Sequence, residues 1–282
     1  MTQPSQKKLH PYTLMKFHKP LQFLYGGLLL AGLTSASHAA VYSQNFTFPD
    51  GTTNLGDGSS IQNAQNPDSN NTAYKASVIG GALELTSAAV TSGSSSFIVP
   101  AIINSSKGFT ATFDVFLQDT AGGASPADGF SFTYGNTFAL NAIFGEEGPG
   151  GTNSLSWVID TWDNGVGDQG IRNKINGADG FKQSFVPLSD GGTVSTSITL
   201  TWHPTNGMSM NVAALGTVFS NYPTAGFTGG DDYLFGFGAR TGGATETVRI
   251  DNLVITTVPE PTAALLAGLG GLGAFLRRRR VN

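Results

Sequence analysis

Short apolar runs separated by clusters of turn-forming residues occupy the middle of this 282-residue chain. Along 109–117, 129–134, 197–202 and 248–255, apolar and small or polar residues alternate over much of each run. A period of two places the two kinds of side chain on opposite faces, as in half-buried antiparallel strands. Gly, Asn, Ser and Asp lie between the runs, and the polar stretch 51–71 is predicted to be a long surface loop. The pattern predicts an all-β sandwich or barrel.

The first 39 residues have the three parts of a secretory signal peptide. Four lysines precede an uncharged apolar stretch from Leu21 to Leu33, and Ser37-His38-Ala39 supplies small residues at a cleavage site. The apolar stretch is shorter than the roughly 20 residues that span a membrane. We therefore predict a signal helix that is removed on export, with a single N-terminal anchor as the alternative.

The C-terminal 25 residues, 258–282, have a similar three-part organisation. Pro259-Glu260-Pro261 precedes a weakly apolar stretch, 262–276, and Arg277 to Arg280 follow it. Arginines at this end would remain cytoplasmic. The tail resembles the PEP-CTERM sorting signal, which implies a short transmembrane helix, an exosortase-type processing enzyme, and a final place at the cell surface or in the extracellular matrix. An ordinary tail anchor is the alternative.

Removal of both ends leaves one domain, predicted at 40–257, whose charge differs from that of the whole chain. The chain has 15 basic and 19 acidic residues. Four lysines lie in 1–39, and four arginines with one glutamate lie in 258–282, so the domain keeps seven basic and 18 acidic residues, about −11 net. Such a surface disfavours nucleic acid as a partner and favours a divalent cation that takes carboxylate oxygens.

Composition also narrows the chemistry that the domain can perform. The absence of cysteine excludes disulfides, thiol catalysis and thiolate metal sites. Three of the four histidines lie in the predicted signal peptide, so His203 alone remains for a zinc site or a catalytic triad. It precedes Pro204 at a predicted strand end, which favours a solvated turn residue.

One loop concentrates oxygen donors. A strand predicted over 156–161 leads into Asp160, Asn164 and Asp168, with the backbone carbonyl of Trp162 between them. Several oxygens from a flexible loop are typical of a calcium site. The spacing does not match an EF-hand, and a plain Asp/Asn turn has the same composition.

Three further segments accompany this loop. Ala127-Asp128-Gly129 precedes it, the Gly-rich segment 145–151 lies between, and Gly-Phe-x-Ala-x-Thr-Gly follows at 236–242. In this order the motifs resemble the legume-type (L-type) lectins, over about 120 residues from Ala127 to Ile255. The resemblance implies a concanavalin-like jelly-roll β-sandwich and binding of glycans or exopolysaccharide.

The resemblance also implies roles for particular residues. Asp128, after a cis peptide bond, would accept hydrogen bonds from sugar hydroxyls. Asp160, the Trp162 carbonyl, Asn164 and Asp168 would hold calcium, and Asn164 and Trp162 would also belong to the sugar site.

Loops would complete the sugar site. The Gly-rich segment would donate a backbone N–H from Gly148, Gly150 or Gly151, with Gly150 taken as the candidate. The loop 241–247 would line the side that sets sugar specificity.

The chain departs from the family at three places. Val158 stands where these lectins carry a metal-binding glutamate, and no histidine lies near 169–171. These departures imply a calcium-only site without a transition metal. Glu146 and Glu147 stand where the family usually has small residues, and we predict that they face solvent, with a contribution to an ion site as the alternative.

Two other functions remain open beside a non-enzymatic lectin. A glycan hydrolase would need two opposed carboxylates, and the Glu-x-Asp-x-x-Glu signature of such enzymes is missing around Asp160, although Glu146 with Glu84 or Glu246 remains a conceivable pair. A structural or adhesive matrix protein would use the sandwich without a specific sugar site.

Overall fold

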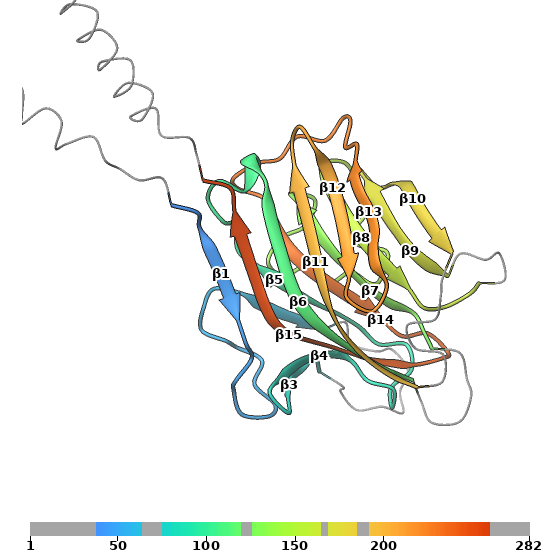
Figure 1. Cartoon of the computed structure of the whole chain (residues 1–282). Coiled ribbons are helices and arrows are strands. Elements are labelled where there is room, and N and C mark those ends of the chain that lie inside the picture. Colours follow the sequence, from blue (N-terminus) through green and yellow to red (C-terminus); the bar gives the residue numbers. More distant parts are fainter. Residues whose placement is uncertain (1–37, 64–74, 120–125, 165–168, 185–191, 260–282) are drawn as a thin grey trace, which may run out of the picture. The chain divides into compact units, whose positions relative to one another are not determined.

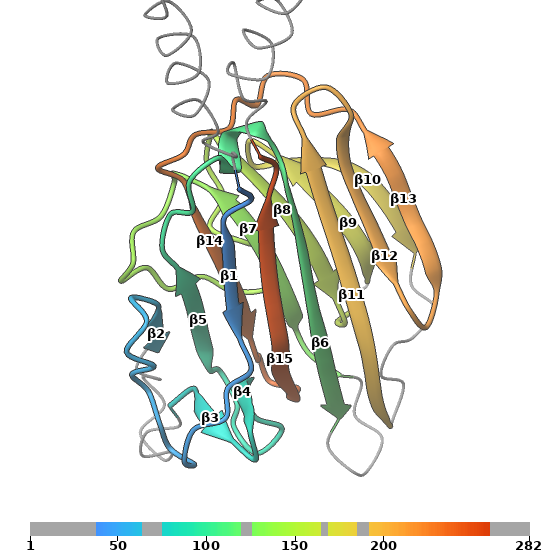
Figure 2. The same ribbon diagram turned by 60° about the vertical axis from the view of Figure 1, so that its left-hand side comes forward.

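The computed structural model describes residues 38–63, 75–119, 126–164, 169–184 and 192–259. Two antiparallel sheets lie face to face in this part of the chain, as the two views show (Figures 1 and 2). The first sheet has the strand order β13 (Gly216–Tyr222), β12 (Gly207–Val212), β11 (Thr193–His203), β6 (Phe109–Asp119), β15 (Glu246–Thr257), β4 (Ala82–Thr86), β3 (Ser77–Ile79), with β1 (Val41–Gln44) also paired to β15. The second has the order β10 (Ala178–Ser184), β9 (Gly170–Ile175), β8 (Ser154–Asp160), β7 (Gly129–Gly135), β14 (Leu234–Arg240), β5 (Ser94–Val99), β2 (Ser60–Asn63).

The predicted all-β sandwich is confirmed. Each alternating run of the sequence lies within a strand, and helix in the described residues is limited to a 3-10 turn at Ser105–Lys107. The prediction of a continuous surface loop over 51–71 is wrong in part, because β2 lies within it and pairs with β5. The short segment Ser60–Asn63 gains its ladder hydrogen bonds from a distant strand, and local composition does not reveal such a partner.

Aromatic residues from both sheets fill the space between them. Along β6 the side chains of Phe109, Phe113 and Leu117 are buried. The ring of Phe109 meets that of Phe235 edge-on at 4.9 Å, and Phe113 meets Phe237 in the same way at 4.9 Å. Such pairs add to the stabilisation by burial of apolar surface. This core packs the second sheet, which carries the candidate site, against the first.

Strand register brings the lectin-like motifs to one end of the second sheet. Gly129, at the start of β7, lies opposite Asp160 at the end of β8 and opposite Arg240 at the end of β14. The Asp128 N–H donates to the Arg240 carbonyl at 2.8 Å. Gly129 has a φ of +107°, and a Cβ there would overlap the Ile159 carbonyl, so the position requires glycine.

The described domain begins and ends at neighbouring points. Val41 in β1 lies opposite Thr256 in β15. The predicted signal peptide and sorting segment lie outside the described residues, apart from two residues at the inner end of each. In the described ranges, no helix has the length and hydrophobicity needed to cross a membrane.

Candidate functional site

Two adjoining hollows lie where β7 begins and where β8 and β14 end. The first has a volume of about 330 Å³, and the second, about 550 Å³, lies beside the loop after β14. Asp128, Trp162, Asn164 and Arg240 line both. The first is completed by four charged residues, Glu146, Glu147, Asp160 and Arg172. The second is completed by small and polar residues, Ser92, Ser94, Thr241, Gly242, Gly243 and Ala244.

The structure thus gathers four of the predicted site residues, Asp128, Asp160, Trp162 and Asn164, around one hollow. Asp168 lies outside the described residues. Gly150 does not line either hollow, although its φ of +67° is one that glycine adopts readily.

Asp128 is the most distinctive side chain of the site. Its peptide bond with Ala127 is cis, as the resemblance implies. The side chain is 8% exposed, and its Oδ2 has no hydrogen-bond partner among the described residues. The Arg240 Nε lies 2.9 Å from this oxygen, so the two groups attract as an ion pair without the alignment of a hydrogen bond. Burial raises the pKa of the Asp128 carboxyl, and Arg240 opposes that rise.

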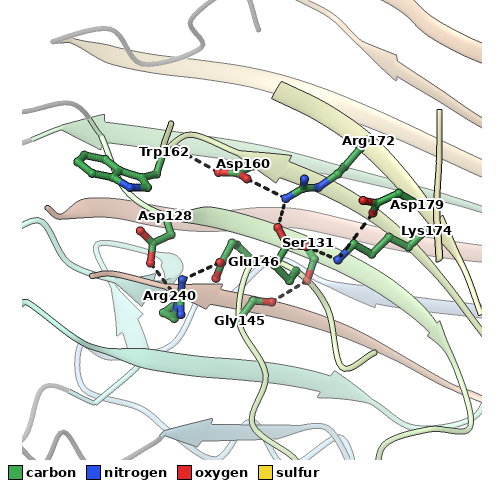
Figure 3. Close-up of polar contacts among 11 residues, drawn as sticks. Asp128, Ser131, Gly145, Glu146, Asp160, Trp162, Arg172, Lys174, Asp179 and Arg240 are labelled. Atoms are coloured by element: carbon green, nitrogen blue, oxygen red, sulfur yellow. Dashed lines mark hydrogen bonds and ion pairs between the residues drawn. The ribbon is translucent and has the colours of Figure 1, made fainter. Parts of the chain in front are cut away.

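Glu146 contacts the same guanidinium and corrects a prediction. Its carboxylate is buried, and Oε1 lies 3.0 Å from Arg240 Nη2 (Figure 3). Burial raises the pKa of the Glu146 carboxyl, and Arg240 opposes this rise as well. The prediction that Glu146 faces solvent is wrong, because the cationic side chain at the end of β14 offers it a partner in the hollow.

Arg172, on β9, is a site residue that sequence reasoning missed, as is Arg240 on β14. The Arg172 Nη2 donates to Asp160 Oδ2 at 2.8 Å (Figure 3). It also donates to Glu147, which in turn pairs with Lys174. Glu147 is thus engaged in ion pairs although partly exposed. Arg172 lies opposite Val158 in the β8–β9 ladder. The register places its side chain beside Asp160, but the register follows only from the fold.

The donor chemistry at the end of β8 fits a hard cation. Asp160 offers a carboxylate, whose Oδ1 also accepts the Trp162 N–H at 3.1 Å, and Trp162 and Asn164 offer a carbonyl and an amide oxygen. The four carboxylates that line the first hollow exceed its two guanidiniums by two negative charges. Within the described ranges, no group of three or more His, Cys, Asp or Glu side chains is arranged to hold a metal ion by itself.

The glutamates that could pair with Glu146 in a hydrolase have other contacts. Glu84, on β4 of the first sheet, pairs with Arg249 at 2.6 Å. Glu246, at the start of β15, accepts the Thr161 hydroxyl at 2.8 Å. Neither residue lines the two hollows.

The loop predicted to set specificity begins at a fixed point. Thr241 Oγ1 donates to the Val90 carbonyl and accepts the Gly93 N–H, both at 2.9 Å. Thr241 through Ala244 then line the second hollow. The prediction of a loop as far as residue 247 is wrong at its end, because Glu246 and Thr247 belong to β15.

Comparisons with known proteins agree with these observations. Residues 257–280 match the family described as PEP-CTERM protein-sorting motif. A search of curated proteins found no match.

Solved structures of plant lectins share the fold. Peanut lectin is 16% identical, with a TM-score of 0.57 over 79% of this chain and 99% of the lectin. Basic winged bean lectin, solved with Tn-antigen, is 17% identical, with a TM-score of 0.58 over 78% and 100%. Acidic winged bean lectin, solved with methyl-α-D-galactose, is 20% identical, with a TM-score of 0.53 over 77% and 98%. The chain therefore combines a PEP-CTERM sorting motif with a domain that has the legume lectin fold.

Proposed function

We propose that the domain at 40–257 is a carbohydrate-binding, lectin-like module whose sugar site depends on calcium. The observation that carries this proposal is the hydrogen bonding of the Asp128 carboxylate. Asp128 lines a hollow with Asn164 and Trp162, and its buried Oδ2 has no hydrogen-bond donor among the described residues. Buried polar atoms are rarely unpartnered in folded proteins, so a ligand hydroxyl that donates to Oδ2 completes the site.

The other site residues have complementary duties in this proposal. Asn164 donates its amide NH₂ to the sugar, and the half-buried Trp162 ring offers an apolar face. Gly150 supplies a backbone N–H from the Gly-rich segment. Calcium, held by Asp160, the Trp162 carbonyl, Asn164 and Asp168, orients the Asn164 amide for this contact.

The proposed route of the protein follows from its ends. Residues 1–39 direct export, and residues 258–282 insert transiently into the membrane until an exosortase-type enzyme processes them. The match to the sorting motif supports this route. The domain then meets glycans or exopolysaccharide at the cell surface or in the matrix, and its net charge of about −11 keeps nucleic acid away.

Binding by the full chain tests the proposal. On an array of immobilised neutral mono- and oligosaccharides, wild type should give signals that EDTA removes and calcium restores. Calcium should also raise the melting temperature, because an ion that binds only the folded state stabilises it. Asp128→Ala should lose the glycan signals and keep the calcium-dependent rise.

Other outcomes would identify the rival functions. No glycan signal and no thermal response to calcium would favour a structural or adhesive sandwich. Release of soluble sugars from the array by wild type, but not by Glu146→Gln, would favour a glycan hydrolase that uses Glu146.

A further inference from the structure

The Gly-rich segment forms a strap, defined here as residues 144–151, across the face of the second sheet that points away from the core. The Phe144 N–H donates to Ser96 Oγ on β5 at 2.8 Å. The Gly145 carbonyl accepts the Ser131 hydroxyl on β7 at 2.9 Å. Close packing on β14 requires Gly238, since a Cβ there would lie 2.6 Å from the Phe144 carbonyl oxygen. The strap therefore lies directly on the sheet.

Two adjacent glutamates attach the strap to two different strands of the sheet. Glu146 pairs with Arg240 on β14 (Figure 3), and Glu147 pairs with Arg172 and Lys174 on β9. In the sheet, β7 and β8 lie between β9 and β14. The two attachments thus flank the strands that present Asp128 and Asp160.

Each arginine also contacts one of these aspartates. Arg240 Nε lies 2.9 Å from Asp128 Oδ2, and Arg172 Nη2 lies 2.8 Å from Asp160 Oδ2. Two parallel chains result, in which a strap glutamate acts on a site aspartate through a shared guanidinium. The planar guanidinium has five donors in a fixed fork, so the glutamate on one side constrains what the other side can do.

We propose that Glu146 and Glu147 are positioning residues with separate duties. Glu146, through Arg240, keeps Asp128 available to the sugar, and Glu147, through Arg172, keeps Asp160 available to calcium. This inference rests on the proposed function of the site and adds the division of labour within it.

The physical reason is competition for each guanidinium. While Glu146 shares the charge of Arg240, Asp128 Oδ2 keeps a position for a sugar hydroxyl. Without the carboxylate of Glu146, Arg240 turns its donors to Asp128 and competes with that hydroxyl. In the same way, loss of Glu147 leaves Arg172 to neutralise Asp160 alone, which weakens the attraction of Asp160 for a cation.

Two affinities measured on the full chain test the division. Calcium affinity is titrated with calcium chloride alone, and glycan affinity is measured on the neutral-sugar array at saturating calcium. Glu147→Gln should lower calcium affinity by at most about tenfold, because Glu147 acts on Asp160 only through Arg172 and loss of a ligand's direct partner costs about 10- to 100-fold; glycan binding should be restored at saturating calcium. Glu146→Gln should lower glycan affinity about tenfold and leave calcium affinity within about twofold.

A buried carboxylate outside the site provides the matched control. Glu84 pairs with Arg249 in the first sheet and is buried like Glu146. Glu84→Gln should lower the melting temperature without changing either affinity. If a strap variant does not fold, Arg240→Lys should reproduce the glycan defect and Arg172→Lys the calcium defect, since lysine keeps the charge and loses the fork.

The outcomes distinguish the separate duties of Glu146 and Glu147 from the proposed function of the site. If wild type binds calcium and glycans but both strap variants change the same affinity, or neither differs from Glu84→Gln, the division of labour is overturned and the proposed function stands. If wild type binds neither calcium nor any glycan, both are overturned.

Discussion

The two arginine-centred halves of the hollow differ in the burial of the arginine. In one half the carboxylates of Asp128 and Glu146 are 8% and 7% exposed, and the Arg240 side chain is 53% exposed. In the other half the Arg172 side chain is 9% exposed, and Glu147 is 39% exposed. A half-exposed cation beside buried acids can move aside for a ligand at a small cost in free energy, whereas a buried cation contributes to the stability of the fold.

The strongest test of this contrast removes the buried cation. Arg172→Met should destabilise the full chain by about 3–5 kcal/mol, because it removes the guanidinium that pairs with the buried carboxylate of Asp160. Urea unfolding measures the loss. Arg249→Met is the control, since Arg249 also pairs with a buried glutamate but is 31% exposed. A loss no larger than that of the control would contradict the framework role of Arg172.

The next test addresses the oxygen that we assign to the ligand. Asp128→Asn keeps the shape of the side chain and removes its charge. Glycan affinity should fall about 10- to 100-fold, as expected for a lost hydrogen bond to a charged group. Folding stability should stay the same or rise, because burial already disfavours the ionised carboxyl. Titration calorimetry and thermal unfolding of the same samples check both, and unchanged glycan affinity would remove Asp128 from the site.

A smaller loss of stability, which depends on pH, is expected when the half-exposed Arg240 is replaced. Arg240→Gln should cost about 1 kcal/mol at pH 8. Burial raises the pKa values of Asp128 and Glu146, and loss of Arg240 raises them further. Groups with raised pKa values favour the folded state as they take up protons, so the loss should shrink as the pH falls towards 5. Unfolding in urea across this range measures the change, and a loss that grows on acidification would contradict it.

The smallest loss of stability is expected for Asp57, a carboxyl outside the hollow. Its dependence on pH has the opposite sign. Burial alone would raise the pKa of the Asp57 carboxyl, but hydrogen bonds from Ser59, Tyr42 and Gln44 lower it overall. A lowered pKa contributes stability above the usual carboxyl range and loses it as the pH falls. Asp57→Asn should therefore cost less than about 1 kcal/mol at neutral pH. The difference from wild type in urea unfolding should shrink as the pH falls below the usual carboxyl range, and a difference that grows on acidification would exclude this origin.

Much of the framework could be predicted because its signals are local. The alternation along 109–117 and 248–255 reports which side chains face the core, and β6 and β15 contain these runs. The Ala-Asp-Gly motif at 127–129 was informative for the same reason, since its glycine is required where β7 begins. β2 escaped prediction because a four-residue strand depends on its partner β5 rather than on its own pattern.

The charged contacts of the site could not be predicted because they depend on strand register. Glu146 and Arg240 are far apart in the sequence, and nothing near Glu146 indicates that a guanidinium will cover it. Arg172 becomes a neighbour of Asp160 only when β9 pairs with β8. Adjacent glutamates in a glycine-rich segment appear solvent-exposed on composition alone.

The sequence by itself determined the strand pattern, the acidic character of the domain, the sorting motif at the C-terminus and the order of the lectin-like motifs, since each depends on residue type and spacing. Only the tertiary structure decided that Asp128 Oδ2 has an ion pair but no hydrogen-bond donor among the described residues, that Glu146 is buried, and that two arginines divide the hollow. The physical reason is that a charged side chain takes its burial and its partner from strands that meet through the fold.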